Sequence, residues 1–160
     1  MKVPPTDANV PAPVLKRLRR VCLSFPEAYE EPAWVGVRWR VKARTFAHVL
    51  TIIGGKPQAH ARAAGTDGPA TVLTFRASDE EVVAFREMGR PFFFGGWGRD
   101  VVGLRLDDRT DWREVAELMT ESYCLMAPKT LAARVGRRSH LARPTRSVAA
   151  MSLRHRWRPN

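Results

Sequence analysis

The histidine, cysteine and acidic residues are the first candidates for chemistry in this sequence, because such side chains supply general bases, nucleophiles and metal ligands. The histidines are His48, His60, His140 and His155. They are scattered, and the sequence has no Cys-x-x-Cys pair, no His-Glu-x-x-His motif and no Gly-x-Ser-x-Gly elbow. His48 falls in a mostly apolar strand pattern, where a hydrogen-bonded structural imidazole is the common role. We therefore expect no enzymatic activity, no cofactor and no metal.

Two short motifs look like ligand sites but have simpler explanations. Asp107, Asp108 and Asp111 are close enough in sequence to hold a cation, yet a turn followed by a helix N-cap accounts for all three carboxylates. The Gly-Gly-Lys run at 54–56 lacks the glycine spacing and the Lys-[Ser/Thr] ending of a phosphate-binding P-loop. It predicts a turn.

Positive charge is the pattern that indicates a function. The formal net charge is +11, and nine of the 27 lysines and arginines lie in residues 128–160, which contain no acidic residue. Lysine and arginine neutralise phosphates and release condensed counterions without reading the sequence of the bases. We therefore expect nucleic-acid binding, with DNA as the first candidate and RNA as the alternative, through backbone contacts with little base readout.

The candidate phosphate contacts fall in three segments, namely residues 38–44, residues 97–99 and residues 129–138. Around Trp39, basic residues alternate with apolar ones, which in a β-hairpin places the positive charges on one face. Arg44 leaves that face if the turn begins at Lys42, and a simply solvated outer face is the competing interpretation. The candidate nucleic-acid-binding residues are Arg38, Arg40, Lys42, Arg44, Trp97, Arg99, Lys129, Arg134, Arg137 and Arg138.

Apolar periodicity predicts the elements that must position these residues. Helices are expected over 14–25, over 79–88 after the Ser78 cap, and from Trp112 to Pro128 after the Asp111 cap. Strands are expected around Trp39 and Val41 and over 46–53, 71–75, 92–94 and 101–106, with a turn at 43–45 between the first two and a long loop over 54–69. This order predicts an α+β domain of two layers, an antiparallel sheet with the helices on one face. Trp39, Phe85, Trp112 and Tyr123 are assigned to its core.

The chain divides into three parts by composition. Residues 1–12 form a proline-rich arm, residues 13–131 the folded domain, and residues 132–160 an arginine-rich tail that we expect to be disordered. No apolar run approaches the roughly 18 residues of a membrane span, and the first residues lack the apolar core of a signal peptide. Cys22 and Cys124 fall beside apolar stripes, as buried thiols do in a reducing cytoplasm. We therefore expect a cytoplasmic protein.

Five blocks in this order resemble the MmcQ/YjbR family of small bacterial proteins. They are the helix ending at Phe25-Pro26, the acidic turn at Glu30-Glu31, the hairpin WRVKARTFAHVL, the strand and helix LTFRASDEEVVAFRE, and the run from Gly95 to Leu131. The resemblance implies a frataxin-like or secretion-chaperone-like fold, likened to a double-wing DNA-binding module, and a DNA-binding role. It covers roughly residues 14–131, so it implies nothing about the arginine-rich extension that follows.

A protein-interaction module without enzymatic activity is the rival hypothesis. A sheet of the frataxin-like or secretion-chaperone-like kind can hold a partner protein on its open face, and a cationic tail suits an acidic protein or an anionic membrane surface as well as a nucleic acid. The tail can also be merely solubilising. An affinity that falls steeply with salt favours nucleic acid, whereas a tight interaction that survives removal of the tail favours a protein partner.

Overall fold

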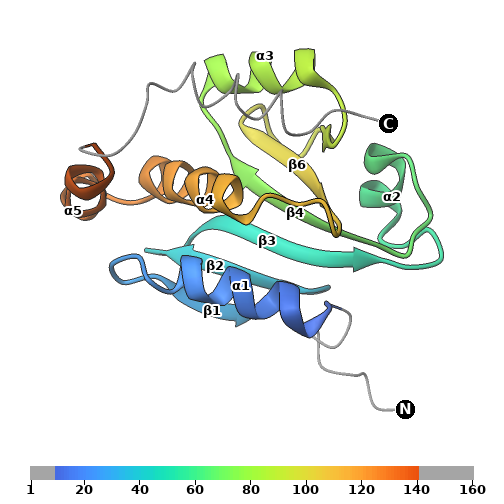
Figure 1. The fold of residues 1–160 in the computed structure, drawn as a ribbon, viewed down its shortest axis with the longest axis horizontal. Coiled ribbons are helices and arrows are strands. Elements are labelled where there is room, and N and C mark those ends of the chain that lie inside the picture. The colour runs from blue at the N-terminus through green and yellow to red at the C-terminus, as the bar shows by residue number, and fades with distance from the viewer. Residues whose placement is uncertain (1–9, 141–160) are drawn as a thin grey trace.

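The computed structural model describes residues 10–140, and side chains up to residue 135. Its strands are β1 (Tyr29–Pro32), β2 (Val37–Val41), β3 (Arg44–Ile52), β4 (Ala70–Arg76), β5 (Phe92–Phe93) and β6 (Val101–Leu106). Its helices are α1 (Ala12–Cys22), α2 (Gln58–Ala64), α3 (Asp79–Met88), α4 (Trp112–Met126) and α5 (Lys129–His140). The strands form one antiparallel sheet in the order β1-β2-β3-β4-β6-β5, with helices packed against it (Figure 1). The predicted α+β class is confirmed.

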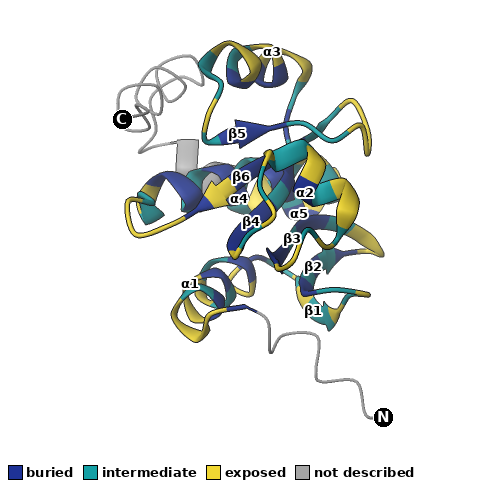
Figure 2. Ribbon diagram, turned by 90° about the vertical axis from the view of Figure 1, so that its right-hand side faces the viewer, coloured by how far each residue is buried: buried dark blue, intermediate teal, exposed yellow. Residues whose placement is uncertain are grey.

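One face of the sheet carries the main core. Val49, Leu73 and Leu104 are paired across β3, β4 and β6, and all three are fully buried. The three helices that the sequence predicted, α1, α3 and α4, supply apolar side chains to the same cluster. Figure 2 shows the buried stretches of α1 and α3 in dark blue. Trp39, Phe85 and Tyr123 lie in this core as predicted, whereas Trp112 is only partly buried beneath the guanidinium of Arg17.

The predicted helix caps form. Ser78 accepts a hydrogen bond from Glu81 N at 3.3 Å, and the Glu81 carboxylate accepts one from Ser78 N at 3.4 Å, which completes a capping box. Asp111 accepts hydrogen bonds from the first turn of α4. None of the described helices is long and apolar enough to cross a membrane.

The opposite face is only partly covered. The row of paired residues Arg38, His48, Thr74 and Gly103 lies on this side, and the first three of them are half-buried. Helix α2 covers one end, where its Ala61 joins a small cluster with Leu50, Ile52, Val72 and Phe93. We call the remainder, carrying Arg38, Arg40, His48, Thr74 and Arg76, the open face.

Two elements differ from the sequence prediction. Residues 54–69, expected to be a loop, contain α2, whose alanines pack against the sheet and which ends at Gly65 in a left-handed conformation. The acidic turn at Glu30-Glu31 contains β1, which pairs with β2. Neither segment has a strong local sequence pattern. Burial of its alanines stabilises α2, and ion pairs from Glu31 to Arg38 and Arg40 link β1 to β2, so both elements depend on contacts made after folding.

Helix α5 extends the domain beyond the expected boundary. Its residue Leu131 is buried in the core, and the helix continues to His140, where a disordered tail was expected from residue 132. Residues 1–9 and 141–160, most of the predicted arm and the rest of the predicted tail, lie outside the described residues.

The Ser122 hydroxyl joins α4 to the sheet. Continuing the β3–β4 register would pair Phe46 with Arg76, but the ladder ends one pair earlier, at Ala47 and Phe75. Ser122 Oγ lies between them, since it accepts from Arg76 N at 2.8 Å and donates to Phe46 O at 2.5 Å. A buried side-chain hydroxyl thus replaces the next strand-to-strand bond.

Replacing Ser122 by alanine should lower the free energy of unfolding by roughly 2–4 kcal/mol, because a part-buried N–H and a buried carbonyl each lose their partner. Urea unfolding measures this change. The exposed Ser24, whose hydroxyl also donates to a backbone carbonyl, provides the control, and Ser24→Ala should change stability little. An equally stable Ser122→Ala protein would show that β3 and β4 can close and bond directly.

Candidate functional site

Strand β2 places two predicted arginines side by side on the open face. Glu31 of β1 accepts a hydrogen bond from Arg38 Nε at 2.7 Å and another from Arg40 Nη1 at 3.0 Å. Desolvation alone would raise the pKa of Glu31, but the hydrogen bonds and charges of the two guanidinium groups outweigh it and lower that pKa. One carboxylate therefore faces two guanidinium groups, which leaves one positive charge uncompensated within this cluster.

The hairpin turn removes the other two predicted members from that face. Lys42 and Ala43 adopt positive φ angles of 48° and 64°, the geometry of a two-residue turn that matches the twist of its strands. Lys42 instead pairs with Glu27 at 2.7 Å, and Arg44 is exposed at the first position of β3. The predicted row of four charges is therefore reduced to Arg38 and Arg40, because the turn begins at Lys42.

The beginning of the C-terminal basic region lies beside this turn. The pKa of Glu27 is lowered first by the hydrogen bond and charge of Lys42, and further by the charge of Arg134 in α5. Figure 1 shows α5 at the same end of the domain as the β2–β3 turn. Lys129 and Arg134 are exposed there, and Arg137 and Arg138 belong to the same helix, with side chains outside the described set. The fold therefore brings two of the three predicted segments together.

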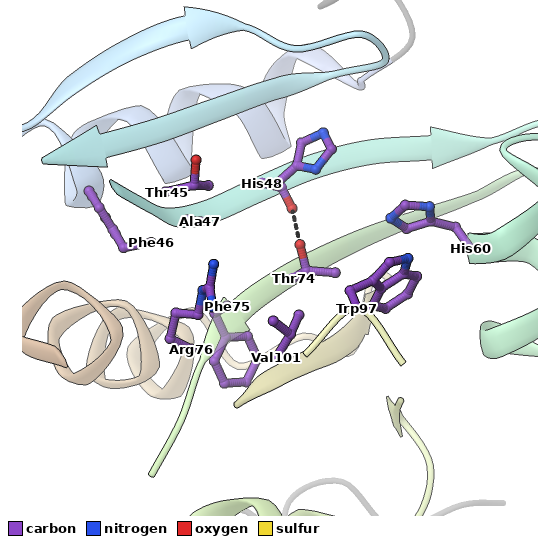
Figure 3. Close-up of a pocket in the computed structure, with 10 residues that line it drawn as sticks. All are labelled: Thr45, Phe46, Ala47, His48, His60, Thr74, Phe75, Arg76, Trp97 and Val101. Atoms are coloured by element: carbon purple, nitrogen blue, oxygen red, sulfur yellow. Dashed lines mark hydrogen bonds between the residues drawn. The ribbon is translucent and has the colours of Figure 1, made fainter. Parts of the chain in front are cut away.

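Trp97 lies at a hollow in the open face, with a cavity volume of about 240 Å³ (Figure 3). Its lining residues are Thr45, Phe46, Ala47, His48, His60, Thr74, Phe75, Arg76, Trp97 and Val101. The Trp97 indole stacks on the His60 imidazole with ring centres 4.5 Å apart, and His48 meets His60 edge-on at 6.2 Å. Sequence reasoning missed His60 because its segment was expected to be a loop. A histidine inside an alanine-rich run was the only available signal.

Both histidines at the hollow favour the neutral form. His48 Nε2 donates to Val35 O at 2.7 Å, in agreement with the predicted structural role. Burial lowers the pKa of His48, and this effect outweighs the hydrogen bond to Val35. Burial and the adjacent His48 lower the pKa of His60 to about 4. At neutral pH the hollow therefore presents uncharged aromatic rings beside the Arg76 guanidinium, which bonds Asp100 at 3.0 Å.

Arg99 does not join the other candidates. Its guanidinium lies 3.7 Å from the Asp79 carboxylate at the start of α3, and both side chains are almost fully exposed. Such a surface pair contributes little to stability. Arg99 is close to Trp97 in the sequence but does not line the hollow with it, because the chain turns between the two residues.

The aspartates after β6 have the predicted turn and cap roles. Asp107 accepts from Arg109 N at 2.8 Å, and Asp111 accepts from Arg113 N at 3.0 Å. Across residues 10–135, no three His, Cys, Asp or Glu side chains are grouped so that they could hold a metal ion.

Comparison with known proteins identifies a family for the folded part of the chain. A family model described as YjbR matches residues 23–125, which include β1, the β2–β3 hairpin, the hollow and Ser122. Helix α5 begins after the matched segment. Neither the curated proteins nor the solved structures contain a match.

The low pKa of His60 predicts a pH-dependent stability. Its ordinary value is 6.5, so as the pH falls below 6.5 the unfolded chain binds a proton that the folded state takes up only near pH 4. Wild-type protein should therefore lose about 1 kcal/mol more stability than His60→Gln between about pH 7.5 and about pH 5, after allowance for the partial exposure of the ring. Urea unfolding at the two pH values tests this, and parallel losses in both proteins would contradict it.

Proposed function

The chain belongs to the YjbR family, and from this premise we propose that it binds nucleic acid through the arginines of its open face and the basic residues of α5. The observation that carries the proposal is the Arg38–Glu31–Arg40 cluster. Two guanidinium groups share one carboxylate on an uncovered sheet face, and both remain partly exposed.

This cluster suits phosphate for two reasons. A guanidinium group is planar, always charged and can donate two parallel hydrogen bonds to an anion. Glu31 also holds both side chains in place, so less side-chain freedom is lost when a phosphate arrives. The excess positive charge supplies the counterion-release term that dominates binding to a nucleic-acid backbone.

The α5 helix extends the basic surface from the hairpin turn. Exposed Arg44 opens β3 beside this turn, and exposed Arg134 lies near the Lys42–Glu27 pair. The sequence continues after His140 with five further arginines and no acidic residue. The basic surface formed by the hairpin turn, Arg44 and α5 favours contacts with several successive phosphates, which position a nucleic acid without reading its sequence.

A protein-interaction module is the second candidate, and Trp34 is the observation that favours it. This side chain is 96% exposed at the turn between β1 and β2. Exposed tryptophans are typical anchors of protein interfaces. The neighbouring open face is lined by charged and polar groups, however, which suits a polyanion better than an apolar protein surface.

The double variant Arg38→Gln/Arg40→Gln should bind a labelled oligonucleotide about ten-fold more weakly, or worse, at low salt, as expected when hydrogen bonds to charged groups worth roughly 1.5 kcal/mol or more are lost. The log–log salt slope should also fall by about one for each lost phosphate contact. Fluorescence anisotropy at several salt concentrations measures both quantities.

Lys16→Gln/Arg20→Gln is the matched control, because it removes two exposed charges from α1 on the other side of the sheet. It should retain most of the affinity. If both double variants weaken binding equally, the protein responds only to net charge and the open face is not the site. If the wild-type chain binds neither duplex nor single-stranded oligonucleotides, the protein-interaction hypothesis takes precedence.

A further inference from the structure

The side chain of Trp34 is almost free of contacts with the rest of the domain. It is 96% exposed, so both faces of its indole ring lie in solvent. The other tryptophans of residues 10–135 differ, because Trp39 is buried and Trp97 and Trp112 pack against other side chains. A large apolar ring gains free energy when a partner covers it. Trp34 therefore offers a free aromatic surface.

The turn that carries Trp34 is fixed to the sheet even though the ring is free. Ala33 N donates to Gly36 O at 3.1 Å, which closes the turn. Gly36 has a φ angle of 81° and lies so close to β3 that an added Cβ would approach Val49 O to 1.9 Å. The Val35 side chain packs against the small apolar cluster that includes part of α2. The backbone of this turn is thus positioned before a partner arrives, which reduces the entropy lost on binding.

This turn lies beside the arginines of the open face. Val35 O accepts the hydrogen bond from His48 Nε2, and His48 pairs with Arg38 across β2 and β3. Trp34 precedes Arg38 by four residues in the sequence. Their backbones are therefore no more than about 14 Å apart. A flat apolar ring and the Arg38–Glu31–Arg40 cluster, with its excess positive charge, are neighbours at this rim of the open face.

A free ring beside excess positive charge fits a single-stranded nucleic acid. Each nucleotide supplies a flat aromatic base, which stacks on a protein ring whatever its sequence, and a phosphate, which guanidinium groups bind. The turn itself, residues 33–36, contains no acidic side chain that would repel the strand. An apolar pocket of a partner protein would also cover Trp34, but it would leave the neighbouring arginines without an anion. The charge therefore favours the nucleic acid.

We propose that Trp34 stacks against one unpaired base while the Arg38–Glu31–Arg40 cluster holds a neighbouring phosphate, so that the protein binds single strands more tightly than duplex. The inference rests on the nucleic-acid binding proposed above and adds an aromatic contact to it. Inside a duplex both surfaces of a base are covered by its neighbours, so a paired base offers no surface to Trp34. Single-stranded DNA and RNA share this chemistry, and the sugar distinguishes them.

The test compares the full-length wild-type chain with its Trp34→Ala variant. Fluorescence anisotropy measures binding to labelled oligothymidylate, to oligouridylate and to a DNA duplex of equal length. Wild-type protein should bind a single strand more tightly than the duplex. Trp34→Ala should weaken single-strand binding roughly five- to a hundred-fold, as loss of one base–aromatic stack does, and leave duplex binding unchanged. The free ring contributes little packing, so the variant should melt at the wild-type temperature.

Tryptophan emission gives a direct readout of stacking, because a base stacked on an indole quenches its fluorescence. Trp34→Phe keeps a ring that can stack but removes this signal. It should therefore retain most of the single-strand affinity and lose most of the quenching. Trp157→Phe is the matched control, because it removes a tryptophan from the basic C-terminal region instead. It should retain both the affinity and the quenching.

The outcomes distinguish this inference from the proposed function. If wild-type protein binds duplex and single strand equally, with a steep salt dependence, and Trp34→Ala changes neither, stacking on Trp34 is wrong while phosphate binding stands. Quenching that persists in Trp34→Phe and disappears in Trp157→Phe would place the base on the C-terminal region instead. Self-association of the wild-type chain in analytical ultracentrifugation, lost in Trp34→Ala without any change in oligonucleotide binding, would make Trp34 a protein contact. If wild-type protein binds no oligonucleotide, both proposals fail together.

Discussion

The Ser122 hydroxyl stands where β3 and β4 stop bonding to each other, and it links α4 to both strands at that point. It satisfies Arg76 N and Phe46 O, and both are backbone groups of the sheet. At the same position β3 contains an irregularity, since Arg40 pairs with Thr45 but Trp39 pairs with Ala47. The extra residue, Phe46, turns its ring into the core against Phe25 and Tyr123. The Ser122 hydroxyl thus joins α4 to the sheet between the core on one side and two backbone positions that line the hollow, Phe46 and Arg76, on the other.

Internal ion pairs determine how the positive charge of the domain is presented. Glu31 orients Arg38 and Arg40, Glu27 holds Lys42, and Glu30 binds Arg19 of α1 at 2.8 Å. These exposed or half-exposed pairs contribute little to stability individually, but they restrict long side chains to defined places. A surface with oriented arginines differs from a diffuse cloud of charge, because the fold fixes where each guanidinium group lies.

The two faces of the sheet meet different requirements. The helix-covered face buries large apolar side chains from α1, α3 and α4 in one core. The open face instead groups arginines with Trp97, His60 and His48, and burial keeps the imidazoles neutral at physiological pH. Arginine side chains and uncharged aromatic rings therefore lie on one surface.

Local patterns in the sequence determined α1, α3, α4, β4 and β6, because caps and apolar periodicity act within a few residues of each other. They also placed Trp39, Phe85 and Tyr123 in the core. Only the tertiary structure decided that Glu31 forms a strand beside β2, that 58–64 is a helix, and that His60 meets Trp97. Those features depend on residues far apart in the sequence, whose burial and ion pairs exist only after the chain has folded.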